Sequence, residues 1–373
     1  MSLIFLLACS LVARTPPDAG LTEAEIATLV RTGTAHPESW ARDVRAALVD
    51  AHQVPDREHV CQVLAVIEQE SGYAADPAVD GLGAIVDRGI HDSLDSLGPL
   101  EGPTRKALLD HTPSGETRTF EQRIKTLRTE QDVDRLFRDV VEYHREKAPK
   151  LARLAEVLFP RLLERYNPIA TAGSMQVSVA WAQSVGRDEG LDAQAVRERL
   201  YTQTGGVHYG VRRLFEGADY DEPVFRFADY NAGEYASRNA AFQIHVGTVT
   251  GLDVVSDGDL LAYDRDGRPS GEDGQTMTAL LAWRLQRAPD LSEGHLRRDV
   301  RKEKEQSFED TETWTRVRKD FETMKQRPPK YAAIPDVALA SPKMTRTRTT
   351  RWFAEMVDGR YRTCLARGTP KPG

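Results

Sequence analysis

The sequence predicts a mainly α-helical protein. Apolar residues recur at helical spacing over long stretches, candidate strands are scarce, and helix-start signals precede several of the periodic stretches. The clearest example is residues 57–70, in which Val60, Val63, Leu64 and Ile67 follow the i, i+3, i+4, i+7 pattern of one buried helix face.

The remaining elements follow in chain order. Thr22, with Glu25 three residues later, forms a capping-box signature at the start of the first helical stretch. Residues 76–103 are rich in Gly, Asp and Pro and predict a loop, and the Asp/Gly-rich residues 252–271 allow a short hairpin. Helices are expected within residues 21–53, 57–70, 117–165, 174–186, 192–202, 205–216, 222–231, 234–247 and 276–327.

Composition and charge narrow the classes of function. The chain has 373 residues, of which 40% are hydrophobic and 29% charged, and its formal net charge is −7. These values are ordinary for a soluble protein large enough to bury a substantial core. The acidic balance argues against a general nucleic-acid-binding protein, which would be basic.

The N-terminus predicts export. Residues 3–8 form an apolar run that ends at Cys9, far shorter than the ~20 residues that span a bilayer as a helix. Leu6-Leu7-Ala8-Cys9 resembles a bacterial lipobox, in which the cysteine is lipidated; a plain signal peptide or a buried first segment remain the alternatives. Ser10 after the cysteine indicates sorting to the outer membrane, and residues 10–20 read as a tether.

Two cysteines remain if Cys9 carries a lipid. Cys61 and Cys364 form a disulfide in an exported protein, or they are two unrelated buried thiols. The sequence leaves both interpretations open.

Two acids lie at the end of the 57–70 helix. At 100° per residue, Ser71 falls near the centre of the apolar face, with Glu70 about 80–90° to one side and Glu68 about 70° to the other. Either carboxyl group can lie at the core boundary, where desolvation raises its pKa towards the range of a general acid. The alternative is that both line the helix rim in water.

Three short motifs follow one another along the chain. They are Glu70-Ser71-Gly72-Tyr73, Gly173-Ser174-Met175-Gln176-Val177 and Tyr230-Asn231-Ala232-Gly233. Together they resemble the motifs of the lysozyme-like lytic transglycosylases, over about residues 56–82 and 166–247. With the export signal, they resemble a little-characterised bacterial envelope lipoprotein family with a transglycosylase-like core.

The resemblance implies a domain arrangement. Residues 1–20 would be the signal and tether, and residues 21–250 a lysozyme-like catalytic domain. Ser71 and Gly173 are 102 positions apart, farther than is usual in that family, so a helical insertion is expected at about 83–165. Residues 251–373 would be a C-terminal helical extension without a counterpart.

The resemblance also assigns roles to residues. Glu70 would be the catalytic acid, and Ser71 would orient a reacting group. Substrate contacts are implied for Met175 and Gln176 beside the scissile bond, for Tyr230 near Glu70, and for Asn231. Packing is the alternative for Met175 and Tyr230, and a turn-forming role for Asn231.

The implied reaction cleaves the MurNAc–GlcNAc β-1,4 bond of peptidoglycan without water. One glutamate protonates the leaving oxygen and then deprotonates the 6-hydroxyl of MurNAc, which attacks the anomeric carbon of its own ring, so no cofactor is expected. Hydrolysis would need a second carboxylate, for which Asp80, Asp87 and Asp229 are candidates. The histidines show no zinc-binding spacing, and no metal is expected.

The expected partners are peptidoglycan glycan strands and, through a lipid on Cys9, the outer membrane, with the protein facing the periplasm. Nucleic acid is not expected, and an envelope protein partner is possible. The alternative function is a catalytically inactive outer-membrane lipoprotein that binds peptidoglycan or serves an envelope transport system.

Overall fold

The computed structural model describes residues 20–147, 149, 169–264, 267–339 and 348–367. The prediction of a mainly α fold is confirmed. Within the described residues, strands are confined to two short antiparallel pairs, β1 (Thr171–Ala172) with β2 (Val177–Ser178) and β3 (Ala338–Leu339) with β4 (Arg348–Thr349). The expected leader, tether and lipidated Cys9 lie outside the described residues.

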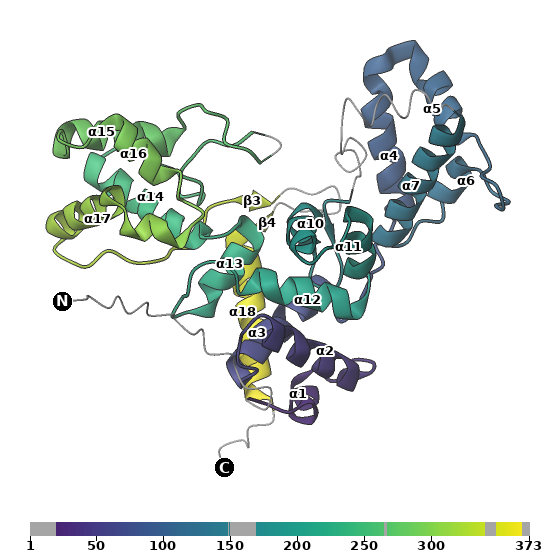
Figure 1. The fold of residues 1–373 in the computed structure, drawn as a ribbon, viewed down its shortest axis with the longest axis horizontal. Helices are drawn as coiled ribbons and strands as arrows, with labels where there is room; N and C mark the ends of the chain where they lie inside the picture. Colours follow the sequence, from purple (N-terminus) through teal and green to yellow (C-terminus); the bar gives the residue numbers. More distant parts are fainter. Residues whose placement is uncertain (1–19, 148, 150–168, 265–266, 340–347, 368–373) are drawn as a thin grey trace, which may run out of the picture.

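The helices form a central core with a lobe on either side (Figure 1). In the central core, α2 packs against α12, and α18 packs against both α3 and α13. Its helices are α1 (Glu23–Leu29), α2 (Pro37–Asp50), α3 (Arg57–Glu70), α10 (Val179–Asp188), α11 (Ala193–Leu200), α12 (Gln203–Leu214), α13 (Pro223–Ala232) and α18 (Thr350–Ala366).

Helix α3 is the centre of this core. Asp56 caps its N-terminus, where the carboxylate accepts a 2.8 Å hydrogen bond from the backbone N–H of His59. The predicted apolar face is buried, and the neighbouring residues Cys61 to Val66 are buried as well. A helix covered on nearly every side can present polar groups only at its ends, which is where Glu70 lies.

Helix α18 returns from the far end of the chain to complete the central core. Its residues Phe353, Ala354, Val357 and Tyr361 belong to the same apolar cluster as α3. The last helix of the expected C-terminal extension therefore packs with the domain expected for residues 21–250.

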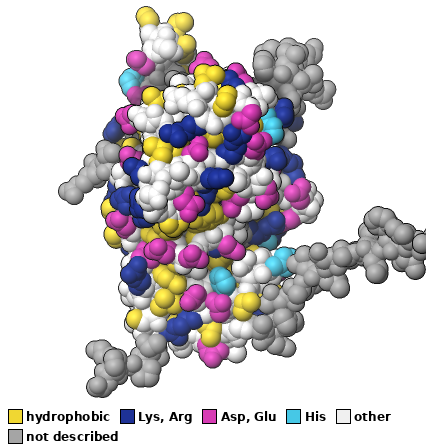
Figure 2. All heavy atoms as spheres, turned by 90° about the vertical axis from the view of Figure 1, so that its left-hand side faces the viewer, with side chains coloured by type: hydrophobic (Ala, Val, Ile, Leu, Met, Phe, Trp, Pro, Cys, Tyr) yellow, Lys and Arg dark blue, Asp and Glu magenta, His cyan; other side chains and the backbone are white. Residues whose placement is uncertain are grey.

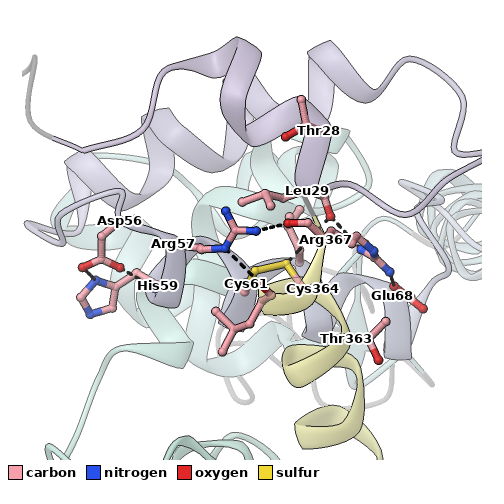
Figure 3. Close-up of a disulfide and its surroundings, with 12 residues drawn as sticks. Thr28, Leu29, Asp56, Arg57, His59, Cys61, Glu68, Thr363, Cys364 and Arg367 are labelled. Carbon is pink, nitrogen blue, oxygen red and sulfur yellow. Dashed lines mark hydrogen bonds and ion pairs between the residues drawn. A yellow bond between two sulfur atoms is a disulfide. The ribbon is translucent and has the colours of Figure 1, made fainter. Parts of the chain in front are cut away.

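A disulfide fastens this packing. Cys61 of α3 and Cys364 of α18 are bonded across 303 positions of sequence, with their Cα atoms 5.5 Å apart. Close to it, the Arg57 Nε–H donates to the carbonyl of Leu365 at 3.1 Å, and an Arg367 guanidinium N–H donates to the carbonyl of Leu29 at 2.7 Å (Figure 3). Of the two interpretations that the sequence leaves open, a disulfide or two unrelated buried thiols, the structure has the disulfide.

The first lobe, called the inserted lobe here, lies between α3 and β1 in the chain. Phe120, Ile124 and Leu136 contribute to a small core of its own. The prediction of a loop over residues 76–103 is wrong, because Gly81 adopts a left-handed conformation (φ 68°) from which a helix starts at once. The elements are α4 (Leu82–Leu94), the 3-10 helix η1 (Asp95–Leu100), α5 (Glu101–Leu109), α6 (Phe120–Ile124) and α7 (Glu130–Lys147).

The other side lobe, called the second lobe, has an apolar core around Phe242, Trp283, Phe308 and Trp314. Basic and acidic side chains are interspersed on the face shown in Figure 2. Its elements are α14 (Ala236–Thr250), α15 (Gln275–Arg287), α16 (Glu293–Val300), the 3-10 helix η2 (Gln306–Asp310) and α17 (Glu312–Lys325), so the stretch expected to be helical at 276–327 is three helices and a 3-10 turn.

No helix in the described part of the chain has both the length and the apolar composition needed to cross a membrane.

Candidate functional site

Glu70, the last residue of α3, lies where several elements of the fold meet. The residue as a whole is partly exposed, whereas its carboxyl group is buried. Burial of the carboxyl group raises its pKa from 4.5 to about 7, the nearby charge of Glu130 raises the pKa further, and Arg360 of α18 opposes both. A carboxyl group with this pKa is divided between acid and base at neutral pH.

The structure separates the two acids that the helical wheel could not distinguish. Glu68 forms ion pairs with two cations at the C-terminal end of α18, Arg367 at 3.3 Å and Arg360 at 3.8 Å (Figure 3 shows Glu68 with Arg367). Glu70 instead interacts electrostatically with Tyr230 of α13 and Glu130 of α7. Glu68 therefore joins α3 to α18, and Glu70 is the acid within the motif cluster.

The second motif forms the turn between β1 and β2, residues 173–176. Gly173 has a φ of 82°, and a Cβ atom there would lie 2.3 Å from the carbonyl oxygen of Leu200. Only glycine fits this combination of a left-handed backbone and a close neighbour. The turn closes through the backbone N–H of Gln176, which donates to the Gly173 carbonyl at 3.0 Å, with Gln176 itself at a φ of 52°.

Met175 joins the second motif to the third. The Tyr230 hydroxyl donates to the Met175 carbonyl oxygen at 2.7 Å. The Met175 side chain is 0% exposed and packs so closely on α12 that a Cβ atom at Gly210 would lie 2.2 Å from its sulfur. The side chain expected to line the cleft is therefore core, and Met175 acts on the site through its backbone.

Tyr230 is held neutral beside Glu70. Burial raises the pKa of its hydroxyl well above the ordinary value, and the charge on Glu70 adds to the increase. The hydroxyl is therefore a fixed hydrogen-bond donor, with its proton directed at the Met175 carbonyl.

Gln176 connects the turn to the inserted lobe. Its amide nitrogen donates to an Oε of Glu130 at 2.9 Å, and its amide oxygen accepts from the Thr171 hydroxyl at 3.0 Å. Glu130 is 2% exposed and is the first residue of α7. The side chain expected to contact substrate is thus bonded to a second buried acid.

Ser71 and Asn231 make local structural contacts. The Ser71 hydroxyl donates to the Ile67 carbonyl at 3.1 Å at the end of α3. Asn231 is exposed, and its amide oxygen accepts from the Thr350 hydroxyl at 2.9 Å, which joins α13 to the start of α18. Both residues lie next to members of the cluster in sequence, but the first bond closes the end of α3 and the second joins α13 to α18.

Ser174, the second residue of the second motif, is 0% exposed. A Cβ atom at Gly206 of α12 would lie 2.9 Å from its Oγ, so the space is small. Within the described residues its hydroxyl has no hydrogen-bond partner. The tight contact with α12 explains why a small residue stands here.

The three residues considered for a second carboxylate either have other partners or are exposed. Asp229 accepts hydrogen bonds from the Tyr220 hydroxyl and the Ser237 backbone N–H, both at 2.6 Å. Asp87 pairs with Arg105 in the inserted lobe, and Asp80 is exposed. The acid that interacts with Glu70 is instead Glu130.

Sequence reasoning missed Glu130 and Arg360. Thr129, with Asp132 three residues on, marks a helix start, because the two residues exchange side-chain-to-backbone hydrogen bonds at 3.3 and 3.1 Å. That signal places Glu130 in a first helical turn. Nothing in the sequence says that this turn lies beside the end of α3.

One cluster in the inserted lobe could hold a metal ion. His91, Asp95 and Glu101 place their ligand atoms within 4.8 Å of one another. No sequence spacing marks this set, because its three residues come from two helices and the 3-10 helix between them. The cluster is remote in sequence from the three motifs, and its His91 and Asp95 side chains are exposed.

Comparison with known proteins gives a family but no activity. The family model described as "Protein of unknown function (DUF1615)" matches residues 33–367, nearly all of the described chain. The chain belongs to this family. It is 34% identical over 374 residues to "Uncharacterized protein YaiW" of Escherichia coli (strain K12), covering 98% of this chain and 96% of that one. No solved structure matches.

Proposed function

We propose that this protein is a peptidoglycan lytic transglycosylase that cleaves the MurNAc–GlcNAc β-1,4 bond without water, with Glu70 as its single acid and base. The observation that carries the proposal is the state of Glu70. Glu70 is a partly exposed residue at a helix end whose carboxyl group is buried, with a pKa raised to about 7. It lies beside Tyr230, whose hydroxyl donates a hydrogen bond to the second motif.

The proposed reaction balances with one proton. Glu70 in its acid form gives a proton to the glycosidic oxygen, the bond from the anomeric carbon to that oxygen breaks, and GlcNAc leaves with the proton. Positive charge develops on the anomeric carbon of MurNAc. Its 6-hydroxyl attacks that carbon and loses its proton to Glu70, which forms a 1,6-anhydro ring and restores the acid.

A pKa near 7 suits this double role. The first step needs the protonated carboxyl group and the second needs its conjugate base, and efficiency is greatest when the pKa of such a group lies near the working pH. An ordinary surface glutamate with a pKa of about 4.3 would be almost fully ionised at neutral pH and would not supply the proton.

The proposed location is the periplasmic side of the outer membrane, with a lipid on Cys9 as the anchor. The Cys61–Cys364 disulfide supports an exported protein, because such bonds persist in oxidising compartments. The proposed substrate polymer lies in the same compartment.

One observation favours the alternative of an inactive lipoprotein that binds peptidoglycan or serves transport. The Met175 side chain is buried, and the amides of Gln176 and Asn231 are engaged in internal hydrogen bonds. These three side chains were expected to contact sugar, so fewer groups are free to do so. In this alternative the chain binds sacculi equally well with and without Glu70.

The test compares two neighbouring acids. The purified chain from Ser10 onward is incubated with peptidoglycan sacculi, and release of soluble fragments is followed for the parent, Glu70→Gln and Glu68→Gln. We expect Glu70→Gln to lose activity by on the order of 10²–10⁴-fold, the usual contribution of a general acid, and Glu68→Gln to retain it. Equal activity of the parent and Glu70→Gln would contradict the proposal.

A further inference from the structure

We propose that Glu130, supplied by the inserted lobe, is the second carboxyl group of this site and acts as a positioning residue for Glu70. The role deepens the proposed function and rests on it. It also gives the inserted lobe a role in the site. Helix α7 would supply one residue to a site whose other residues come from α3, α13 and the 173–176 turn.

Glu130 is deeply buried. Only 2% of this residue is exposed, and acids are rarely buried so fully without a specific partner. The Gln176 amide donates to it at 2.9 Å. Because Gln176 also holds Thr171 and lies next to Met175, Glu130 is joined to the turn whose carbonyl receives the Tyr230 hydroxyl.

The structure also holds the start of α7 firmly in place. Asp134, one turn after Glu130, forms a buried ion pair with Arg197 of α11 at 3.3 Å. The backbone N–H of Val79 donates to the Arg128 carbonyl at 2.8 Å, just before α7 begins. The first turn of a helix also favours a negative charge, because its free N–H groups point outward there. The start of α7 thus holds Glu130 against the 173–176 turn of the central core.

Charged and polar groups from three helices act on the ionisation of Glu70. Glu130 on α7 opposes its ionisation, and Arg360 on α18 favours it. Tyr230 on α13 faces Glu70 as a neutral hydroxyl, and Arg213 of α12 acts on Tyr230. By opposing that ionisation, Glu130 helps to keep the proton on Glu70, which the first chemical step requires.

The experiment is a carbon-13 NMR titration of the Glu70 side-chain carboxyl group in protein labelled at glutamate, assigned by its loss in Glu70→Gln. The variants are Glu130→Gln, which keeps an oxygen to accept from Gln176, and Arg360→Gln as the control of opposite sign. We expect the titration midpoint of Glu70 to fall by about one pH unit or more in Glu130→Gln and to rise in Arg360→Gln. A midpoint unchanged in Glu130→Gln but raised in Arg360→Gln would overturn the inference.

Two further measurements keep the result decisive. If Glu130→Gln does not fold, Glu130→Asp retains the charge one methylene farther away and should give a smaller fall in the midpoint; no fall would count against the inference. In the sacculus assay, Glu130→Gln should move the loss of activity at high pH to lower pH, with activity about fivefold lower at pH 7 if the midpoint falls from 7 to 6.

The NMR readout separates this inference from the proposed function. A shifted midpoint in a protein without activity on sacculi would support the role of Glu130 and contradict the transglycosylase. Activity on sacculi with an unshifted midpoint would do the reverse.

Discussion

The Tyr230 hydroxyl donates a 2.7 Å hydrogen bond to the backbone carbonyl of Met175, across 55 positions of the chain. This bond joins the second and third sequence motifs beside Glu70. It also makes the site depend on the core, because Met175 is fully buried and its side chain rests on Gly210 of α12. A substitution in α12 that displaces Met175 should therefore alter the surroundings of Glu70.

Gly210→Ala tests this dependence. The added Cβ would lie 2.2 Å from the Met175 sulfur and 2.6 Å from its Cβ, so Met175 must move. Overpacking of this kind costs about 1–3 kcal/mol, and we expect lower activity on sacculi as the Tyr230 acceptor shifts. Denaturant unfolding measures the first effect and fragment release the second.

Gly89→Ala is the matched control. Gly89 lies in α4, and a Cβ there meets nothing within 4 Å. This change should stabilise the helix by about 0.5–1 kcal/mol and leave activity unchanged. If Gly210→Ala behaves in the same way, the coupling between α12 and the site is refuted.

The raised pKa of Glu70 predicts a pH-dependent stability. A carboxyl group whose pKa is higher in the folded than in the unfolded state stabilises the protein below the unfolded value, and that stability is lost as pH rises through the folded value. For Glu70 the loss falls between pH 4.5 and about 7. The two values differ by an amount worth up to about 3 kcal/mol.

Glu70→Gln removes this ionisation. We expect the variant to match the parent in its free energy of unfolding at pH 4.5 and to exceed it by on the order of 2–3 kcal/mol at pH 8. Urea unfolding at both values measures the difference. Glu68→Gln, which loses the ion pairs to Arg360 and Arg367, should show no such gain in stability. A constant difference between parent and Glu70→Gln across this range would mean that the Glu70 carboxyl is not desolvated.

The Cys61–Cys364 disulfide should control the attachment of α18. It links two residues that are 303 positions apart, and loss of a native disulfide commonly costs about 2–5 kcal/mol. We expect reducing agent to lower the melting temperature of the parent. A Cys61→Ser, Cys364→Ser double variant should melt lower and show no response to reducing agent; an unchanged melting temperature on reduction would contradict the structure.

His245 predicts that acid weakens the second lobe. This residue of α14 is 2% exposed, and burial together with Arg318 and Arg327 lowers its pKa from 6.5 to about 4. A base with a depressed pKa favours folding above its unfolded value, and that contribution is lost as pH falls through the interval from 6.5 to 4.

His245→Leu removes this titration. Near-ultraviolet circular dichroism, which reports Trp283 and Trp314 in the core of this lobe, should show acid unfolding of the parent at higher pH than of His245→Leu. Coincident acid transitions in the two proteins would exclude His245 as the cause.

The sequence predicted those parts of the fold whose signal is local. The apolar period of α3 and the capping box of Thr22 and Glu25 both appear in the structure. Helix α4 was missed because glycines and aspartates outweighed the period of Leu82, Ile85 and Val86, although the left-handed Gly81 is itself a helix start.

The candidate site was predictable only in part, because several of its interactions connect distant segments. The choice between Glu68 and Glu70 depends on α18, which supplies Arg360 and Arg367 from almost 300 positions away. The interaction of Glu70 with Glu130 depends on how the inserted lobe packs against the central core. A helical wheel places the residues of a single helix, so it cannot predict contacts with α18 or α7.

The central claim is the chemistry of Glu70, and its most direct test is the identity of the products. Purified peptidoglycan is digested with the chain from Ser10 onward and with Glu70→Gln, and the fragments are read by mass spectrometry. We predict 1,6-anhydromuramyl ends from the parent and none from the variant. Reducing ends would show hydrolysis and contradict the single-acid mechanism, and intact sacculi that still bind the protein would contradict catalysis altogether.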